Sequence, residues 1–546
     1  MNLNSGFFSV TGQIVDVVSG KIFPGRIEIE DGKIVAVEHF EHAEGHYILP
    51  GLIDAHVHIE SSMLLPSEFA RLSVVHGTTT TVSDPHEIAN VLGKEGIRFM
   101  IENGRKVPFR FYFGAPACVP ATPFETSGAE IGPEDVDEIL SWPEINYLSE
   151  MMNFPGVLNG DPVVKKKLAS AKKYGKPVDG HAPGLDGEDA IAYANAGIST
   201  DHECFTTEEA IDKIKAGMKI LIREGSAARN FDELIPLISE YPQEIMFCSD
   251  DKHPDDLVNG HINLLVKRSL KAGYRFMEIM RACTLNPVRH YNLESGLLQL
   301  GDKADFIVVD HPDSFNVIST YVDGIKVAEN GKTLIESVIE KPINLFNARK
   351  LKVADLEVKA LSDCIKVQQA LEGQLITVQK LHKAKIVDGN VVSSAEDDVL
   401  KMMVMNRYSH ADPAIDFVSG FGFKRGAIAS TVAHDSHNII AVGVDDASIV
   451  KAVNLLIDVK GGISYVDGKE SGVLPLPVAG LMSDGDGYQI ADLYSSMNLS
   501  VMKLGSELDA PFMTLSFMAL LVIPAIKLSD KGIFDGTTFN FTTLFK

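Results

Sequence analysis

The chain has 546 residues and a mass of 59.4 kDa, which is too long for one simple domain and indicates two or three. Its 45% hydrophobic and 23% charged residues are typical of a folded globular protein and exclude wholesale disorder, collagen-like repeats and disulfide-rich miniproteins. The 50 basic and 74 acidic residues give a net charge of −24, which disfavours nucleic acids and anionic membrane surfaces as partners.

The five cysteines are scattered and include no CxxC pair. This pattern is typical of reduced thiols and predicts a cytoplasmic protein rather than a disulfide framework or a zinc ribbon. The N-terminal MNLNSGFFSV lacks a basic segment followed by a long apolar one, so we expect no signal peptide. The most apolar stretch, 511–526, is shorter than the roughly 20 residues that cross a bilayer, and it predicts a buried helix or strand.

Residues 8–48 alternate apolar and polar side chains and are interrupted at Ser-Gly, Pro-Gly and Asp-Gly, which predicts short strands joined by turns. The same pattern returns at 303–327, in KADFIVVD and STYVDGIKV. Two such β segments, far apart in the sequence, can close one small domain around an insertion. We therefore predict a composite β-sandwich domain formed by residues 1–48 and 293–345.

The insertion, residues 49–292, alternates short apolar runs with helical patterns that end at glycine. In chain order the runs are IDAHVH (53–58), TTTTVSDPHE (78–87), FRFYFGAPA (109–117), INYLSEMM (145–152), KPVDGHA (176–182), ISTDHECF (198–205), KILIREGS (219–226) and EIMFCSDD (244–251). Eight strand–helix units over about 240 residues have the size and rhythm of a (β/α)8 barrel. After residue 345 β-rich segments mix with helical ones, so we predict a separate α+β domain at 346–546. The fold class is therefore α/β.

His56 and His58 end the first predicted barrel strand. Side chains at i and i+2 of a strand point the same way, so both imidazoles reach one point at the C-terminal mouth, where barrel enzymes place their catalytic groups. The pair alone is a weak signal, because structural histidines are common near turns.

Four other predicted strands also end in polar side chains. They are Glu150 on strand four, His181 on strand five, His202 on strand six, and Asp250 with Asp251 on strand eight. Chance would have to place such groups at five strand ends independently, so we favour a site for two divalent metal ions. A ligand set of imidazoles and carboxylates without thiolate suits iron(II), manganese(II) or zinc(II).

Longer motifs of the sequence resemble those of a known family. PGLIDAHVHIESS resembles the strand-one signature of the amidohydrolase superfamily, and GDKADFIVVD resembles its return strand into the small β domain. HGTTTTVSDPHEIANV, SEMMNFPGVL, DGHAPGL, STDHECFT, CSDDKHPDDLVNGHI and TLNPVRHYNLESGLLQLGDKADF together resemble the bacterial and archaeal adenine deaminases, as does GFGFKRGAIASTVAHDSHNII in the C-terminal part. The resemblance covers essentially the whole chain.

The resemblance implies hydrolysis of adenine to hypoxanthine and ammonia, for purine salvage, at a binuclear iron or manganese centre, with zinc as the alternative. It matches four imidazoles to metal ligands: His56, His58, His181 and His202. Glu150 takes the place where many relatives carry a carboxylated lysine that bridges both metals, and Asp250 matches the strand-eight aspartate that is both ligand and proton shuttle. We expect a homo-oligomer that binds adenine as its small-molecule substrate and binds neither nucleic acids nor membranes.

The chemistry assigns further roles. Attack at C6 of adenine needs hydroxide at neutral pH, which metal ions supply by lowering the pKa of bound water to about 7. N1 must gain a proton as C6 becomes tetrahedral, and the leaving amine must be protonated. Asp250 is the candidate that carries the water proton to the amine. Glu87, after strand two, is the candidate donor to N1, with His86 as its competitor; a stabilising charge at a helix N-terminus is the alternative role of Glu87.

Strand alternation predicts that only one of Asp250 and Asp251 faces the mouth. The resemblance selects Asp250, and Asp251 stays a candidate substrate-binding residue together with His86 and Glu60. His58-Ile-Glu60 also matches the HxE half of zinc nucleobase deaminases, but no PCxxC completes that site.

His434, Asp435 and His437, in AHDSHN, have three possible roles. They form a second metal site, reach over the barrel mouth, or mark a polar turn.

Three other functions remain open: a cyclic-amide hydrolase of the dihydropyrimidinase type, an amino-sugar deacetylase, and a metal-binding scaffold without activity. The first normally carries a lysine on strand four, and INYLSEMM has none. The presence of all five ligand positions disfavours a scaffold.

Overall fold

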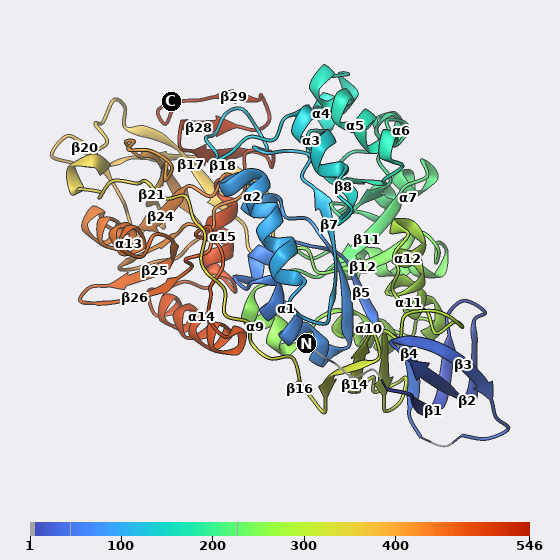
Figure 1. Ribbon diagram of the computed structural model, residues 1–546. Coiled ribbons are helices and arrows are strands. Elements are labelled where there is room, and N and C mark those ends of the chain that lie inside the picture. The colour runs from blue at the N-terminus through green and yellow to red at the C-terminus, as the bar shows by residue number, and fades with distance from the viewer. Residues whose placement is uncertain (1–5, 44, 227) are drawn as a thin grey trace.

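A computed structural model describes residues 6–43, 45–226 and 228–546; residues 1–5 of the predicted small β domain lie outside the described part. Figure 1 shows two lobes, with the barrel and the small β domain on one side and the C-terminal domain on the other. No helix within these described ranges has both the length and the apolar character needed to cross a membrane.

Eight parallel strands form the barrel, one at each predicted run. They are β5 (Leu52–Val57), β6 (Thr78–Ser83), β7 (Arg110–Ala115), β8 (Ile145–Met151), β9 (Val178–Gly180), β10 (Thr200–Asp201), β11 (Lys219–Arg223) and β12 (Ile245–Cys248). Ladders join β5 through β9 and β10 through β12. Backbone hydrogen bonds connect these arcs, among them Ser199 N–H to the Val178 carbonyl and Asp250 N–H to the His56 carbonyl, both 2.9 Å. The predicted (β/α)8 barrel is confirmed.

Helices surround the barrel. They are α1 (Pro66–Ser73), α2 (His86–Gly104), α3 (Pro133–Leu140), α4 (Phe154–Leu158), α5 (Pro162–Tyr174), α6 (Gly187–Asn195), α7 (Thr207–Lys215), α8 (Phe231–Leu234), α9 (Pro254–Asn259), α10 (Ile262–Lys271), α11 (Phe276–Ala282) and α12 (Leu285–Tyr291). In α5 the Asp161 side chain caps the first turn, Pro162 starts the helix, and Gly175 ends it at φ +63°. Val164, Leu168 and Ala171 recur at helical spacing and are buried, which fixes the face that α5 turns to the strands.

The small β domain is one eight-stranded sheet made from both ends of the insertion. Its strands are β1 (Phe8–Asp16), β2 (Lys21–Glu30), β3 (Lys33–His39), β4 (Tyr47–Pro50), β13 (Phe306–Val309), β14 (Val317–Val322), β15 (Ile325–Glu329) and β16 (Lys332–Thr333). The order β16-β15-β14-β13-β4-β1-β2-β3 places β4 between the two segments. Ile27, Ile48 and Phe306 share one apolar cluster, so the sheet encloses its own core, as predicted for a composite domain.

The C-terminal domain contains a second eight-stranded sheet, ordered β18-β17-β22-β21-β24-β23-β25-β26. Its strands are β17 (Cys364–Ala370), β18 (Thr377–Lys383), β21 (Leu400–Met405), β22 (Ala414–Ser419), β23 (Ala427–Ser430), β24 (Ile439–Gly443), β25 (Gly462–Asp467) and β26 (Glu470–Pro475). Smaller sheets are formed by β19 (Lys385–Val387) with β20 (Asn390–Val392), and by β27 (Ile526–Ser529), β28 (Gly532–Asp535) and β29 (Asn540–Phe541). The α+β character predicted for this part is confirmed.

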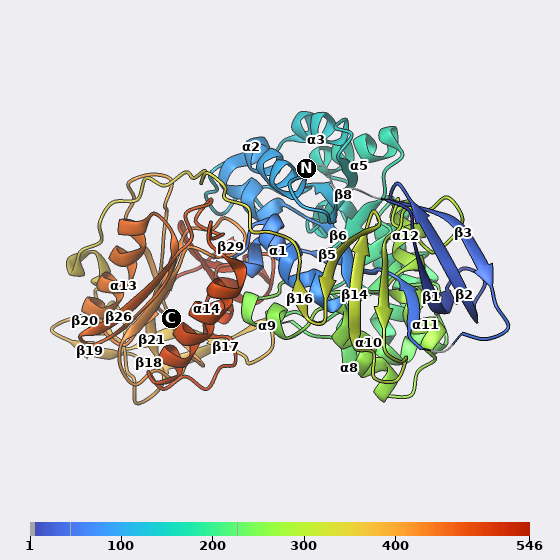
Figure 2. The same ribbon diagram turned by 60° about the horizontal axis from the view of Figure 1, so that its bottom comes forward.

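The two faces of the C-terminal sheet have different partners. Met403 and Met405 of β21 pack in one cluster with α13 (Asp446–Val459). Met402 and Val404, on the opposite face because strand side chains alternate, belong to a cluster shared with α14 (Gly487–Met502), α15 (Pro511–Phe517) and the barrel. Figure 1 shows α14 and α15 on the barrel side of the sheet, and Figure 2 shows the same for α14. The helix α15 occupies the first half of the apolar stretch 511–526 and is buried.

Candidate active site

The C-terminal ends of five barrel strands bring the predicted metal ligands together. His56 lies on β5 and His58 directly after it, and their Nε2 atoms are 3.2 Å apart. Every predicted ligand is at least nine-tenths buried, from His56 at 0% exposure to His181 at 7%. The alternation argument for the His-x-His pair therefore holds in three dimensions.

Glu150 lies between two groups of imidazoles. Its Oε1 is 3.3 Å from His58 Nε2, whereas its Oε2 is 2.7 Å from His181 Nδ1 and 3.3 Å from His202 Nε2. Burial acts to raise the pKa of Glu150, but His181 and the other imidazoles outweigh burial and hold this pKa well below its usual value. A charged carboxylate with one oxygen toward each group has the arrangement of a bridging ligand.

Asp250 completes the first group. Its Oδ1 is 3.2 Å from His58 Nε2 and 3.6 Å from His56 Nε2. Its Oδ2 accepts a hydrogen bond from Arg223 Nη1 at 2.6 Å. Burial opposes the charge on Asp250, but Arg223 and the histidines lower its pKa well below the usual value.

The prediction that only one of Asp250 and Asp251 faces the mouth was wrong. The strand β12 ends at Cys248, and Asp250 has a left-handed backbone with φ +54°, so the period-two rule does not extend to these residues. Both carboxylates line the same cavity. The Asp251 Oδ1 accepts a hydrogen bond from Ser61 Oγ at 2.5 Å.

The donor set fits two divalent metal ions. The sets His56–His58–Asp250 and His56–Glu150–His202 each offer three ligand atoms within 4.8 Å of one another. Two unprotonated ring nitrogens at 3.2 Å repel each other unless a cation or a proton lies between them, and His181 Nε2 is buried without a hydrogen-bond partner among the described residues. Imidazole and carboxylate donors suit a divalent transition metal.

Two residues beside the ligands were not predicted. Arg223 ends β11 and is 1% exposed. Its Nη2 donates to Glu203 Oε2 at 3.0 Å, and its Nη1 contacts both Glu203 and Asp250. Arg223 follows the same strand-end rule that identified the ligands, so the sequence contained the signal. Glu203 follows the ligand His202 directly.

A second layer fixes the loop after β12. Asp54, on β5, accepts hydrogen bonds from Ser249 N–H at 3.0 Å and from His261 Nε2 at 2.8 Å. The other ring nitrogen, His261 Nδ1, is 2.8 Å from Thr78 Oγ1. These contacts connect β5, β6 and α10 to the segment that carries Asp250.

His86 and Glu87 begin α2 beside the metal ligands, and both line the cavity. His86 Nδ1 is 2.9 Å from Asp84 Oδ2. Glu60 is not among the residues that line this cavity. It is buried behind the start of α2, where its Oε1 accepts a hydrogen bond from Ile88 N–H at 3.2 Å, and burial raises its pKa to about 7.

The C-terminal domain covers the mouth of the barrel. His434 lies with its Nδ1 2.7 Å from Glu87 Oε1, and Leu375, Phe517 and Leu520 form the apolar roof. His434 therefore reaches over the barrel mouth, the second of its three possible roles. The free volume of this cavity is about 20 Å³.

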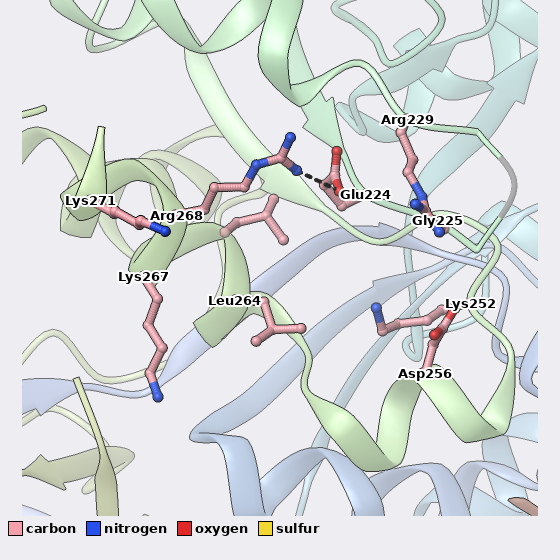
Figure 3. A pocket seen from close by; sticks show the side chains of 10 residues that line it. Glu224, Gly225, Arg229, Lys252, Asp256, Leu264, Lys267, Arg268 and Lys271 are labelled. Atoms are coloured by element: carbon pink, nitrogen blue, oxygen red, sulfur yellow. Dashed lines mark hydrogen bonds and ion pairs between the residues drawn. The ribbon is translucent and has the colours of Figure 1, made fainter. Parts of the chain in front are cut away.

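A roomier cavity of about 440 Å³ lies between α10 and the segments that follow β11 and β12 (Figure 3). It is lined by Glu224, Gly225, Arg229, Lys252, Asp256, Leu264, Leu265, Lys267, Arg268 and Lys271. None of the predicted site residues belongs to this set. The groups with catalytic chemistry converge in the narrow mouth instead.

Comparisons with known proteins agree with this arrangement. The model of the amidohydrolase family matches residues 47–327, and that of the adenine deaminase C-terminal domain matches residues 374–540. Proteins named adenine deaminase from Salinibacter ruber and Methanosarcina mazei are each 53% identical to this chain, over 98% of it and 99% of their own length. The one from Borreliella burgdorferi is 46% identical, with the same coverage.

Among solved structures, a β-aspartyl dipeptidase from Fervidobacterium islandicum has a TM-score of 0.46 at 18% identity, covering 60% of this chain and 98% of its own. The matches in sequence extend over the barrel and the C-terminal domain at high identity. The chain belongs to the adenine deaminase family of the amidohydrolase superfamily.

Proposed function

We propose that this protein is a metal-dependent hydrolase that converts adenine to hypoxanthine and ammonia. The observation that carries the proposal is Glu150, an unmodified carboxylate with one oxygen toward His58 and the other toward His181 and His202. This arrangement lies in a chain that is 53% identical to proteins named adenine deaminase over 98% of its length.

Six residues would hold two divalent ions. His56, His58 and Asp250 form one side, His181 and His202 the other, and Glu150 lies between them. Manganese or iron is the proposed metal, with zinc as the alternative. The bound ions would supply hydroxide near neutral pH by lowering the pKa of water to about 7.

Asp250 is the proposed proton shuttle. It lies among the ligand imidazoles, 3.2 Å from His58 Nε2, and so can take the proton released from water and deliver it to the amine. The amine then leaves as neutral ammonia, since amide ion is too basic to leave. Arg223 holds the other Asp250 oxygen at 2.6 Å and keeps the carboxylate oriented.

The purine side of the site is formed by residues that line the cavity beyond the ligands. His86, Glu87 and Asp251 are the proposed substrate-facing groups. Glu60 supports them from behind, through its hydrogen bond to Ile88 at the start of α2.

The rival cyclic-amide hydrolase of the dihydropyrimidinase type is not favoured. That class normally carries a lysine on strand four, and β8 consists of INYLSEM. The amino-sugar deacetylase has no observation in its favour.

The experiment that tests the proposed function is an ammonia-release assay with adenine, adenosine and dihydrouracil. The protein is stripped with a chelator and then reloaded with Mn²⁺ or Fe²⁺. We expect turnover of adenine that is lost with the metal and restored with about two equivalents. Turnover of dihydrouracil without turnover of adenine, or full activity with less than one equivalent of metal, would refute the proposal.

Three further expectations remain proposals. The division of the chain at residues 48, 292 and 345 is one; β4 extends the first segment to Pro50. The homo-oligomeric state is the second, and light scattering of the purified chain tests it. The third is a cytoplasmic location in a reducing compartment, which suits five free cysteines, four of them buried.

A further inference from the structure

Glu87, the predicted donor of a proton to N1, faces an imidazole with each of its carboxylate oxygens. Its Oε1 is 2.7 Å from His434 Nδ1, and its Oε2 contacts His437 Nε2. Burial opposes the charge, but the two imidazoles hold the pKa of Glu87 well below its usual value. A carboxylate that is already an anion has no proton of its own to give to N1. The proton that N1 needs must come from a neighbour.

The tautomer of His437 follows from its backbone contact. Ala433 N–H donates to His437 Nδ1 at 3.2 Å, so the ring proton of neutral His437 is on Nε2, facing Glu87. A histidine that binds a metal does the reverse: it offers one lone pair to the ion and donates the other N–H. Burial also lowers the pKa of His437 to about 4, which keeps the ring neutral. The cluster Glu87–His434–His437 is compact enough for a metal. Because the His437 ring proton faces Glu87, the cluster instead suits holding side chains in position.

His434 is held so that only one of its nitrogens is engaged. Nδ1 donates to Glu87 Oε1, and the ring stacks on Phe517 of α15 with centroids 4.4 Å apart and planes at 14°. No described residue forms a hydrogen bond with Nε2, and the side chain lines the mouth cavity. The free nitrogen is therefore left for the substrate.

We propose that His434, a residue of the C-terminal domain, is the catalytic acid that protonates N1 of adenine, with Glu87 and His437 as its positioning residues. The inference rests on the proposed function. As hydroxide adds to C6, the C6–N1 π bond breaks and its electron pair moves to N1. N1 takes the proton from His434 Nε2. The imidazole becomes neutral, and its Nδ1–H keeps the hydrogen bond to Glu87. N1–H remains in hypoxanthine, and the proton lost when the C6 hydroxyl becomes a carbonyl restores the charge of His434.

The surroundings of His434 favour its charged form. Glu87 from α2, Asp251 after β12 and Asp435 from its own loop present carboxylates to the ring, while His437 and His253 are neutral neighbours whose pKa burial lowers. Burial opposes protonation of His434, but Glu87 leads the contributions that raise its pKa to about 9.

The main test compares His434→Gln with wild type, both loaded with Mn²⁺. Glutamine keeps an N–H donor but carries no transferable proton. We expect kcat for adenine to fall by about 10²–10⁴, the usual contribution of a general acid, with KM changed far less and two metal equivalents retained. The alkaline limb of the wild-type pH–rate profile should disappear in the variant. The exposed His311 provides the control: His311→Gln should match wild type.

Two further variants separate positioning from bulk structure. His437→Gln keeps an N–H that can face Glu87 and should retain much of the rate, whereas His437→Leu should lose it. Added imidazole should partly restore His434→Ala and leave His311→Ala unchanged.

Several results would overturn the inference. One is a His434→Gln variant with kcat within threefold of wild type; another is a loss of metal in proportion to the loss of rate. A third metal equivalent in wild type that His437→Leu removes would assign the cluster to a metal. If wild type itself releases no ammonia from adenine, the proposed function fails; if wild type is active and the His434 variants are too, only this inference fails.

Discussion

Asp250 and Asp251 are chain neighbours with different surroundings. Asp250 contacts two ligand imidazoles and Arg223, whereas Asp251 accepts a hydrogen bond from Ser61, and burial, then Asp250, raises its pKa. Removing the charge of Asp250 removes a ligand and the proton shuttle together. We predict that Asp250→Asn lowers kcat by about 10²–10⁴ and reduces metal content.

Asp251→Asn should cost less than tenfold in kcat and leave two metal equivalents in place, because its contacts are to Ser61 and to the substrate side. Steady-state kinetics on metal-analysed samples of both variants compare the two directly. A larger loss of kcat in Asp251→Asn would reverse the two roles.

At the same scale, the sequence predicted those residues that obey a local rule. His56, Glu150, His181 and His202 all follow from polar side chains at strand ends. Asp251 did not follow, because a left-handed residue at Asp250 interrupts the alternation. The contact of His434 with Glu87 joins residues 347 positions apart, and no local pattern encodes a distance of that kind.

Among the elements, the barrel strands were predictable because each is buried on both faces and so forms a nearly continuous apolar run. All six residues of β5 and of β6 are buried. Their lengths were less predictable: the run at 198–205 yields only the two-residue β10, directly before the ligand His202. The order of the C-terminal sheet pairs β17 with β22 and β21 with β24, and such long-range pairing has no signature in a strand's own sequence.

One strand of that sheet contains a buried acid that affects stability. Asp416, in the middle of β22, is 1% exposed, and its Oδ2 has no hydrogen-bond partner among the described residues. Burial raises its pKa from 3.8 to about 7. Between those two values the folded chain binds a proton that the unfolded chain releases, so the free energy of unfolding falls as the pH rises through this window. One pKa unit corresponds to about 1.4 kcal/mol, which limits the effect to roughly 4 kcal/mol.

We predict that Asp416→Asn, neutral at every pH, raises the melting temperature at pH 8 and leaves it nearly unchanged at pH 4. Thermal unfolding followed by circular dichroism at both values measures the difference. Asp363→Asn, an exposed position directly before β17 of the same sheet, is the control. Equal shifts at pH 4 and pH 8 would mean that folding does not raise the pKa of Asp416.

On the scale of the whole molecule, the barrel and the C-terminal domain share one hydrophobic core. A single apolar cluster includes Val57 and Leu64 of the barrel together with Met402 and Phe512 of the C-terminal domain. The roof of the active site comes from one lobe and the ligands from the other, so the site exists only while the lobes stay joined. We therefore expect the metal-loaded protein to unfold in one cooperative transition.

The joint between α1 and α14 tests this expectation. Glu68, 1% exposed on α1, accepts hydrogen bonds from Gly487 N–H at 2.9 Å and from Ser337 Oγ at 2.6 Å, and it contacts Arg71, which also pairs with Asp486 at 2.7 Å. Glu68→Ala leaves the buried Gly487 N–H without its partner, while Arg71 keeps its pair with Asp486, so the expected loss is about 1–3 kcal/mol. We predict that differential scanning calorimetry shows one transition in wild type and one in Glu68→Ala, lowered by about 1–3 °C. Glu188→Ala, at an exposed position on α6, should melt with wild type. Two separate transitions in wild type, with only one of them shifted by Glu68→Ala, would show that the lobes fold independently.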